Sequence, residues 1–383
     1  MRTVRLGDVC QQARGSVKPG ACPELRYIGL ESIESGSGMF AKGELSKTPE
    51  TPLANSFRFS PEHVLYGKLR PYLNKVAVPD FEGKCSTEII PLLPNSDIER
   101  EYLAYFLRSG HVVDLISSRT AGARMPRADM DFIFSLPIPL PPLPEQRRIV
   151  DLLSRAEGIV RLRREAEKKA AELIPALFLD MFGDPGRNPK GWDCKTLGEF
   201  CRIIGGSSLP AGEPYSGQEG GLLLMKVSDM NAPGNEVIIS SCKEWITEQK
   251  RTYSSVSEGT IVFPKRGAAI ATNKKRIVSR ALLLDPNLMG VLPDQKMVST
   301  DYLFQWFSAF DLADISSGTT VPQLNKCDLT PLVVPLPPLS LQGQFAIKRA
   351  AVMSIQAQQA SATEKAKATF DVLLARAFSD GQK

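Results

Sequence analysis

Two long segments of the chain carry apolar residues at helical spacing. From Ile149 onward the apolar positions recur three and four residues apart, which is typical of the seam of a coiled coil. The residues on this first seam are Leu152, Ala156, Ile159, Ala166, Ala170, Leu173 and Leu177. A second seam with weaker residues consists of Phe345, Val352, Ile355, Ala362, Ala366 and Leu373. The pattern predicts two long helices that bury their seams against each other or against a partner.

Proline residues predict the limits of the first long helix. We expect it to begin directly after Pro144 and to kink or end at Pro175, because a proline inside a helix lacks the backbone N–H and clashes with the preceding turn. At a rise of 1.5 Å per residue, a helix of about thirty residues would be roughly 45 Å long.

The other parts of the chain, residues 1–136 and 185–331, alternate short β-branched and aromatic runs with Gly, Pro, Asn and Ser. Such runs predict short strands, for example at 63–69, 75–79, 85–93, 259–263 and 276–284. One helix is expected in each part, near 98–110 and 299–310. The pattern therefore predicts an α+β fold with two mixed α/β globular domains separated by two long antiparallel coiled-coil helices.

The chain also repeats itself at a spacing of 196 residues. The phrase "PLPPL" stands at 139–143 and again at 335–339, and "ALFLDMFGD" (176–184) aligns with "VLLARAFSD" (372–380). Single residues that match at the same spacing are Gly122 with Gly318, Pro126 with Pro322, and Gln146 with Gln342. Upstream likenesses are looser and have other spacings, which indicates loops of different length. The sequence thus predicts a pseudo-twofold internal repeat.

Each repeat divides into a globular and a helical part. We expect a first globular domain at 1–143, a first helical region at 144–184, a second globular domain at 185–339 and a second helical region at 340–383. A Pro-rich phrase can serve as a polyproline ligand, but its recurrence directly before each predicted helix favours a stiff hinge.

Composition narrows the class of protein. The 383 residues are 43% apolar and 23% charged, which suits two folded domains, and the net charge of +5 suits a nucleic-acid partner without proving one. Seven scattered cysteines without a C-x-x-C pair, and two histidines at His63 and His111, do not indicate disulfides or a metal site. Because the N-terminus has no apolar signal and no apolar run approaches membrane-spanning length, we expect a cytoplasmic protein without membrane contact.

Several motifs together resemble a known family. They are "LESIESGSG" (30–38), "VLYGKLRPYLNKVAV" (64–78), the Gly-to-Pro segment before each hinge, "PLPPL" and the "EQ" that opens the first long helix. This set, which covers almost the whole chain, resembles the DNA-specificity subunit of type I restriction-modification systems. One departure is "LSLQGQF" (339–345), where the family usually has Glu-Gln followed by Arg or Lys.

The resemblance implies a non-catalytic subunit. Its two globular domains would be target recognition domains, each reading one half of a bipartite double-stranded DNA site. Its helices would set the half-site spacing and hold two methyltransferase subunits, and motor-nuclease subunits would join that assembly. S-adenosylmethionine, ATP and magnesium are expected only on those partners.

A search for catalytic motifs agrees with this expectation. "PDFEGK" (79–84) resembles a nuclease pattern, but Asp80 and Glu82 lie on one short stretch instead of two neighbouring strands. "LPPL" and "DPNL" lack the polar and aromatic residues that a DNA amino-methyltransferase needs. The chain has no phosphate-binding loop of the form G-x-x-x-x-G-K-[ST].

Candidate DNA contacts come from corresponding places in the two repeats. Recognition of bases uses Arg or Lys toward guanine and Asn or Gln toward adenine, while further Lys and Arg bind phosphates. In the first repeat the candidates are Lys68, Arg70, Tyr72, Asn74, Lys75, Arg119, Arg124 and Arg127. In the second they are Lys265, Arg266, Asn273, Lys274, Lys275, Arg276, Thr319, Gln323, Asn325 and Lys326. The sequence does not separate base contacts from phosphate contacts.

Two other interpretations stay open at this point. The chain could be the specificity module of another type of restriction-modification enzyme, or a duplicated protein-binding scaffold without DNA affinity. The scaffold hypothesis predicts no nucleic-acid binding, whereas phosphate contacts predict binding that falls steeply with salt.

Overall fold

The computed structural model describes residues 2–13, 15–41, 54–121, 124–247, 254–317 and 322–379. The chain forms two compact units. The first consists of Met1–Ala166 and Gln359–Lys383, and the second of Glu167–Gln358. Each unit therefore contains one globular part together with segments of both long helices. The sequence analysis divides the chain into four consecutive segments, whereas the compact units each combine separate parts of the chain. The four segments therefore remain a prediction.

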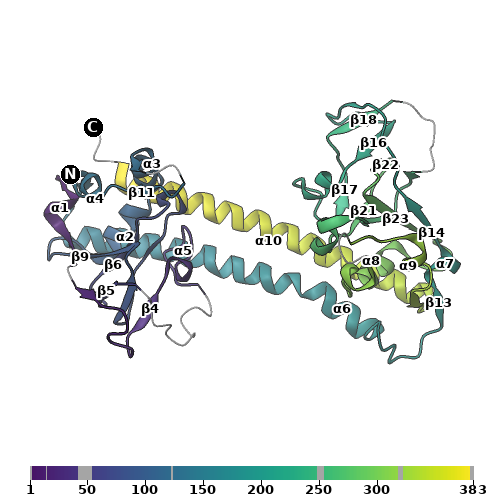
Figure 1. Cartoon of the computed structure of the whole chain (residues 1–383), viewed down its shortest axis with the longest axis horizontal. Helices are drawn as coiled ribbons and strands as arrows, with labels where there is room; N and C mark the ends of the chain where they lie inside the picture. The colour runs from purple at the N-terminus through teal and green to yellow at the C-terminus, as the bar shows by residue number, and fades with distance from the viewer. Residues whose placement is uncertain are drawn as a thin grey trace. The chain divides into compact units, whose positions relative to one another are not determined.

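The first unit contains two four-stranded sheets (Figure 1). One has the order β2–β9–β6–β7, formed by Cys10–Gln12, Ile89–Pro94, Val64–Gly67 and Val76–Ala77. The other has the order β3–β5–β8–β4, formed by Ser16–Val17, Ser56–Phe59, Gly83–Ser86 and Arg26–Ile28, with β4 and β8 parallel. Small pairs join β1 (Thr3–Arg5) to β12 (Pro137–Pro139) and β10 (Thr120–Ala121) to β11 (Arg127–Ala128). The helical segments are α1 (Leu6–Val9), η1 (Leu30–Ser32), η3 (Pro71–Leu73), α2 (Arg100–Arg108), α3 (Gly110–Ser118) and α4 (Met130–Ser135).

The second unit repeats this plan. Its first sheet has the order β14–β23–β20–β21–β17, formed by Cys201–Gly205, Leu288–Pro293, Ile261–Pro264, Arg276–Val278 and Ile238–Ile239. Its second has the order β15–β18–β16–β22–β19, formed by Glu213–Pro214, Glu244–Ile246, Leu222–Met225, Leu282–Leu284 and Ser255–Val256. The pair β16–β22 is parallel, like β4–β8. The pair β13–β24 (Cys194–Thr196 with Val333–Pro335) corresponds to β1–β12. Its helical segments are α7 (Leu197–Phe200), η4 (Val227–Asn231), η5 (Gly267–Thr272), α8 (Thr300–Ser308), η6 (Leu312–Ile315) and α9 (Lys326–Leu329).

The strands and short helices predicted from the sequence are present at the expected places, although their ends differ. The expected runs overlap β6, β7, β9, β20 and β21, and the two expected helices are α2 and α8. The expectation of one helix in each globular part was too low for the first part, which also contains α3. The long helices are α5 (Leu143–Ala171), α6 (Leu173–Phe182) and α10 (Leu339–Ser379). Helix α5 ends at Ala171, four residues before Pro175, where the proline ring would clash with a helical carbonyl. Helix α5 begins one residue before Pro144, close to the expected start.

The largest hydrophobic core of each unit contains residues from both repeats. In the first unit, Tyr102 and Phe106 of α2 pack with Leu153 of α5 and with Phe370 and Phe378 of α10. In the second, residues from α6, α8 and α10 pack together, namely Phe178, Phe182, Tyr302 and Phe345. There the side chain of Gln356 in α10 donates to the carbonyl of Ala170 at the end of α5, 2.6 Å away. The start of α5 thus meets the end of α10, and the end of α5 meets the first half of α10, so the two helices are antiparallel.

The predicted coiled-coil seam is confirmed only in part. Several of its residues are buried or pack against a core, namely Ala156, Ala170, Phe345, Ala366 and Leu373, but others are exposed. Leu152 and Ile159 are 46% and 51% exposed, whereas Leu153 and Val160, one residue later, are buried in the first core. In α10, Ile355 is also exposed while Phe345 and Phe370 are buried. The reason is that each helix packs on a globular core as well as on the other helix. The buried stripe therefore follows the globular core and not a single seam.

A fully buried glutamine explains why the Pro-rich phrase recurs. Gln146 Oε1 accepts from the backbone N–H of Glu99 at 2.8 Å, and its Nε2 donates to the carbonyls of Asp97 and Pro141, both at 2.9 Å. Gln342 makes the matching bonds to Ser299, Pro337 and Met297 at 2.7, 2.8 and 3.5 Å. The hydroxyls of Tyr102 and Tyr302 donate to the carbonyls of Pro139 and Pro335 at 3.0 and 2.6 Å. Hydrogen bonds therefore join each Pro-rich hinge to α2 or α8 and to the residues directly before that helix.

Over the described residues, no helix is both long and apolar enough to cross a membrane. Within the same residues, no group of three or more His, Cys, Asp and Glu side chains could hold a metal ion.

We expect Gln146→Leu to lower the free energy of unfolding by about 2–4 kcal/mol, because it leaves buried backbone groups without hydrogen-bond partners. Gln342→Leu should have a similar effect. Denaturant unfolding followed by circular dichroism measures the change. Gln358→Leu, at an exposed position of α10, is the control and should change the free energy of unfolding by less than about 0.5 kcal/mol. An equal effect in all three variants would contradict the role of the buried glutamines.

Candidate nucleic-acid interface

The two candidate segments of each repeat meet at one junction. In the first unit the backbone N–H of Arg70 donates to the carbonyl of Pro126 at 2.7 Å, and that of Ala128 donates to Lys68 at 2.8 Å. In the second unit the corresponding bonds run from Gly267 to Pro322 at 2.8 Å and from Leu324 to Lys265 at 2.9 Å. Isolated bridges at the same places pair Leu69 with Arg127 and Arg266 with Gln323. The same junction therefore occurs in both repeats. It joins the loop after β6 to the segment around Pro126 in the first unit, and the loop after β20 to the segment around Pro322 in the second.

At the first-unit junction, two arginines and one tyrosine face solvent. Arg70 and Arg124 are exposed, and Tyr72 is 56% exposed. Arg70 has a left-handed backbone with φ of 52°, which turns the chain sharply at the start of η3. Such exposed guanidinium groups can bind phosphate or the O6 and N7 atoms of guanine.

The remaining first-unit cations near the junction are partly neutralised. Arg127 forms an ion pair with Glu88, with an Nη2 to Oε1 distance of 2.8 Å. The hydrogen bond from Arg127, together with the charge of Lys68, holds the pKa of Glu88 below its usual value. Arg119 is exposed and its guanidinium lies 4.7 Å from the ring centre of Phe132. Glu88 was missed by the sequence analysis, because its contact with Arg127 joins residues far apart in the chain.

The second-unit junction has a local excess of positive charge. Burial, followed by the charges of Arg266 and Lys326, lowers the pKa of Lys265, against the opposite effect of Asp285. A Cβ placed on Gly205 would lie 3.3 Å from Lys265 Nζ and 3.9 Å from Lys326 Cε, so both lysines converge on this glycine. Cations that repel one another in this way attract a polyanion. The glycine was not among the candidates, although the "GG" of "IIGGSS" was a signal.

Two amide side chains lie beside these cations. Gln323 Nε2 donates to Asn325 Oδ1 at 2.8 Å, and Asn325 Nδ2 donates to Ser317 Oγ at 3.3 Å. Asn325 also precedes α9 as its N-cap, where its backbone N–H donates to Asp328. Amides of this kind can pair with adenine, so the junction offers both phosphate-binding and base-binding groups. Thr319, Gly122 and Gly318 lie outside the described residues.

Two of the three candidate asparagines, Asn74 and Asn273, hold the fold together. Asn74 and Asn273 have left-handed backbones with φ of 49° and 50°, which asparagine tolerates better than most residues. Asn74 Nδ2 donates to the carbonyl of Arg108 at 3.0 Å, and Asn273 Nδ2 donates to that of Phe310 at 3.3 Å. Their side chains thus fasten the basic loop to the end of α2 or to the chain after α8.

Four further candidates are also bound within the fold. Lys75 Nζ donates to the carbonyl of Leu30 at 2.5 Å, and Lys274 Nζ donates to Asn231 Oδ1. Arg276 Nη2 donates to the carbonyl of Met230 at 3.0 Å. Lys275, only 5% exposed, donates to Asn273 Oδ1 at 2.6 Å and to the carbonyl of Phe310 at 2.9 Å. Replacing the run 274–276 would therefore disturb the loop itself, whatever its effect on DNA.

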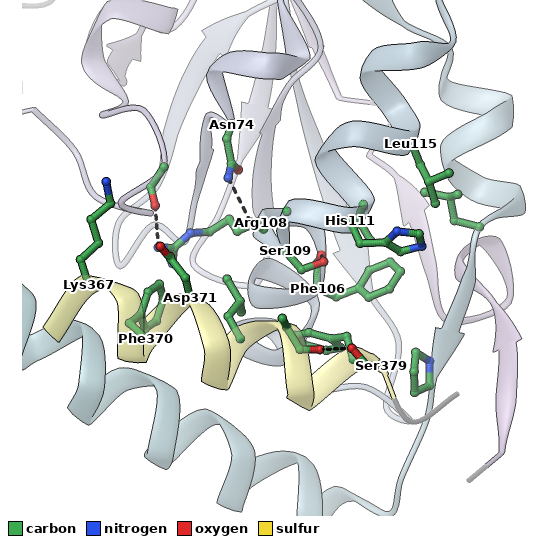
Figure 2. Close-up of a pocket in the computed structure, with 18 of the residues that line it drawn as sticks. Asn74, Phe106, Arg108, Ser109, His111, Leu115, Lys367, Phe370, Asp371 and Ser379 are labelled. Atoms are coloured by element: carbon green, nitrogen blue, oxygen red, sulfur yellow. Dashed lines mark hydrogen bonds between the residues drawn. The ribbon is translucent and has the colours of Figure 1, made fainter. Parts of the chain in front are cut away.

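A cavity of about 750 Å³ lies beside the first-unit junction (Figure 2). Asn74 and Arg108 border it on one side, and Phe370 and Asp371 of α10 border it on another. The second unit has a cavity of about 680 Å³ in the corresponding place, lined by Trp306 and Pro335. In that unit the segment 184–188, which follows α6, forms part of the lining. The candidate cations of the two junctions do not line these cavities, whereas Arg108, which lies next to the first junction, does.

Burial lowers the pKa of Lys275 to about 8, well below the 10.5 of a free lysine. The unfolded chain therefore holds this proton more tightly than the folded chain between these two pH values. The contribution of Lys275 to stability should be greatest above pH 10.5 and should be lost as the pH falls to about 8.

The test is the free energy of unfolding of the wild type minus that of Lys275→Met, measured from pH 7.5 to 10.5. We expect this difference to increase with pH. For the exposed Lys296→Met the corresponding difference should stay flat. A flat difference for Lys275→Met as well would show that this lysine is not buried as described.

Comparisons with known proteins point to one family. The family model described as type I restriction modification DNA specificity domain matches residues 1–172 and 189–348. The specificity subunit of the type I restriction enzyme EcoDI from Escherichia coli is 26% identical over 186 residues, which are 48% of this chain and 40% of that subunit. The MjaIX specificity subunit from Methanocaldococcus jannaschii is 22% identical over 325 residues, covering 80% of this chain and 74% of its own. The aligned part of the Escherichia coli subunit is thus less than half of its length.

Two solved structures share the fold. One is a chain from a structure described as the basis of complex assembly and conformational transition of the type I R-M system. It has a TM-score of 0.65 and 24% identity, and the match covers 98% of this chain and 97% of that one. The other is a type I restriction-modification system S subunit from M. genitalium, with a TM-score of 0.58, 13% identity, and coverage of 98% and 96%.

Proposed function

The chain belongs to the family of type I restriction modification DNA specificity domains, and from that premise we propose that each of its two units reads one half of a split double-stranded DNA target. The observation that carries this proposal is the junction that recurs in both units. The same pair of backbone hydrogen bonds joins a basic loop to a second segment in each repeat. A duplicated surface of this kind suits a target with two separated parts.

The exposed groups at each junction support DNA as the ligand. Arg70 and Arg124 in the first unit, and Arg266 and Lys326 in the second, face solvent and are available for phosphates or guanine. Gln323 and Asn325 would contribute adenine contacts in the second unit. Because the two junctions share their backbone bonds but differ in side chains, the units would read different sequences.

The long helices would set the distance between the half-sites. Helix α10 has 41 residues, which corresponds to a rod of roughly 60 Å at 1.5 Å per residue. One turn of DNA is about 34–36 Å long, so a helix of this length exceeds the spacing of recognition elements one turn apart.

The same helices would hold the partner subunits. Ile159 of α5 and Ile355 of α10 occupy matching positions of the repeat and are 51% and 49% exposed. Two equivalent apolar side chains, one in each unit, suit two copies of one methyltransferase subunit. Motor-nuclease subunits would join this assembly. In this proposal the chain performs no catalysis, and S-adenosylmethionine, ATP and magnesium bind to the partners.

Salt dependence tests the DNA contacts. In the complex with the methyltransferase subunits, we expect Lys265→Gln with Lys326→Gln to weaken binding to a DNA fragment that carries the target. Each lost phosphate contact should reduce the slope of log K against log[salt] by about 1. Lys296→Gln, at an exposed position on the turn before α8, is the control. An unchanged slope in the double variant would remove these lysines from the interface.

Partner docking can be tested at the matched isoleucines. We expect Ile159→Asp and Ile355→Asp each to remove one of two bound methyltransferase subunits, and the double variant to remove both, because a charge replaces the apolar contact. Native mass spectrometry counts the bound copies. Ser154→Asp and Ser354→Asp add the same charge at exposed polar positions of α5 and α10 and should leave the count unchanged. Two copies on the double variant would exclude this docking site.

A further inference from the structure

We propose that the ion pair between the buried Arg108 and the half-buried Glu157 positions the recognition loops of the first unit on helix α5, and thereby sets the specificity for one half-site only. Arg108 and Glu157 are positioning residues in this inference and do not touch DNA. The inference rests on the proposed function, because it assigns an effect on the half-site that the first unit reads.

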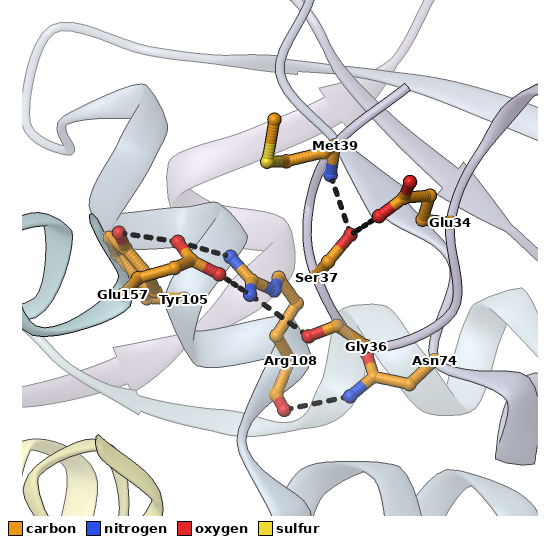
Figure 3. Close-up of polar contacts among 8 residues, drawn as sticks. All are labelled: Glu34, Gly36, Ser37, Met39, Asn74, Tyr105, Arg108 and Glu157. Atoms are coloured by element: carbon orange, nitrogen blue, oxygen red, sulfur yellow. Dashed lines mark hydrogen bonds and ion pairs between the residues drawn. The ribbon is translucent and has the colours of Figure 1, made fainter. Parts of the chain in front are cut away.

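The ion pair joins α2 to α5, with the arginine buried and the glutamate partly exposed (Figure 3). Arg108 is 6% exposed, and its guanidinium binds both carboxylate oxygens of Glu157, with an Nη1 to Oε2 distance of 3.3 Å. Tyr105 donates its hydroxyl to Glu157 Oε2 at 3.0 Å. Burial, followed by the neighbouring Glu157 charge, raises the pKa of Tyr105, so the hydroxyl keeps its proton for this bond. The carboxylate is thus fixed from two sides.

The same arginine holds two loops. Arg108 Nη2 donates to the carbonyl of Gly36 at 3.0 Å, and the carbonyl of Arg108 accepts from Asn74 Nδ2 at 3.0 Å. The loops are also bonded to each other, because the backbone N–H of Gly36 donates to the carbonyl of Asn74 at 2.9 Å. Asn74 lies in the loop that carries Lys68, Arg70 and Tyr72. A chain of contacts therefore runs from α5 through Arg108 to the exposed cations.

The loop at 34–39 lies directly against the guanidinium. Gly38 has φ of 71°, and a Cβ placed on it would overlap Arg108 Nη1. Gly36 has nearly the same backbone, with φ of 72°, but a Cβ there would meet no atom within 4 Å. The side chain of Ser37 closes the loop by accepting from the N–H of Met39 at 3.2 Å and donating to Glu34 at 3.0 Å. The position of Arg108 thus limits where this loop can lie.

The second unit fastens its loop differently. Ser308 stands where the first repeat has Arg108, and Met353 stands where it has Glu157. There, Asn273 binds the carbonyl of Phe310 as Asn74 binds that of Arg108, and Lys275 is a second donor to the same carbonyl. Breaking the ion pair should consequently affect one unit and leave the other as an internal reference.

The test measures binding of the assembled complex to three duplexes: the full target, a duplex with the first half-site replaced, and one with the second replaced. The affinity for the full target divided by the affinity for a replaced duplex measures how strongly that half-site is recognised. For Glu157→Gln we expect this ratio to fall about tenfold for one half-site, roughly the effect of one mismatched base pair. The ratio for the other half-site should change by less than about twofold. A role in stability alone would lower the melting temperature and leave both ratios as in the wild type.

Two matched pairs of variants separate positioning from folding. Glu99→Gln breaks the ion pair between Glu99 and Arg147, which also joins α2 to α5 but contacts neither loop, and both ratios should stay unchanged. Gly38→Ala should reproduce the selective loss seen with Glu157→Gln, whereas Gly36→Ala imposes the same backbone strain without reaching Arg108. This pair keeps the test valid if Glu157→Gln does not fold.

Equal loss at both half-sites, or unchanged ratios in Glu157→Gln and Gly38→Ala, would overturn the inference. If the wild-type complex itself fails to distinguish the three duplexes, the proposed function fails and not the positioning role.

Discussion

The buried glutamine at the start of each long helix is the interaction on which the rest of the structure depends. Gln146 and Gln342 have no exposed surface, and each bonds to three backbone groups of the hinge and of the segment before α2 or α8. An amide that is removed from water must find such partners, so the position of the hinge is fixed within narrow limits. The hydroxyls of Tyr102 and Tyr302 also bind the hinge, by donating to the carbonyls of Pro139 in β12 and Pro335 in β24. A long helix can therefore leave each globular part in one direction only.

The exchange of helix ends between repeats follows from this constraint. The end of α10 completes the first core and α6 completes the second, so neither globular part buries its apolar surface with its own repeat alone. Helix α5 consequently has two different faces. One face carries Leu153 and Glu157 toward the globular part, and the other leaves Leu152 and Ile159 exposed. In the proposed function, α5 would therefore connect the docked methyltransferase subunit with the loops that would contact DNA.

The sequence predicted the architecture better than the site. Strands, short helices and the duplication were readable because alternation, turn residues and the fixed spacing are local or repeated signals. Part of the seam was placed at exposed positions, such as Leu152 and Ile159, because a regular spacing does not show that a helix packs on two neighbours. At the site, Arg70 and Arg266 are exposed as expected. Lys75 and Lys275 are bound to the carbonyls of Leu30 and Phe310, which no local pattern indicates.

Sequencing of modified bases in the genome tests the central claim most directly. Cells that carry this gene and the genes of its partner subunits are compared with cells in which only this gene is deleted. The account predicts that one methylated motif with two separated parts disappears on deletion, while all other motifs remain. Retention of every split motif after deletion would contradict it.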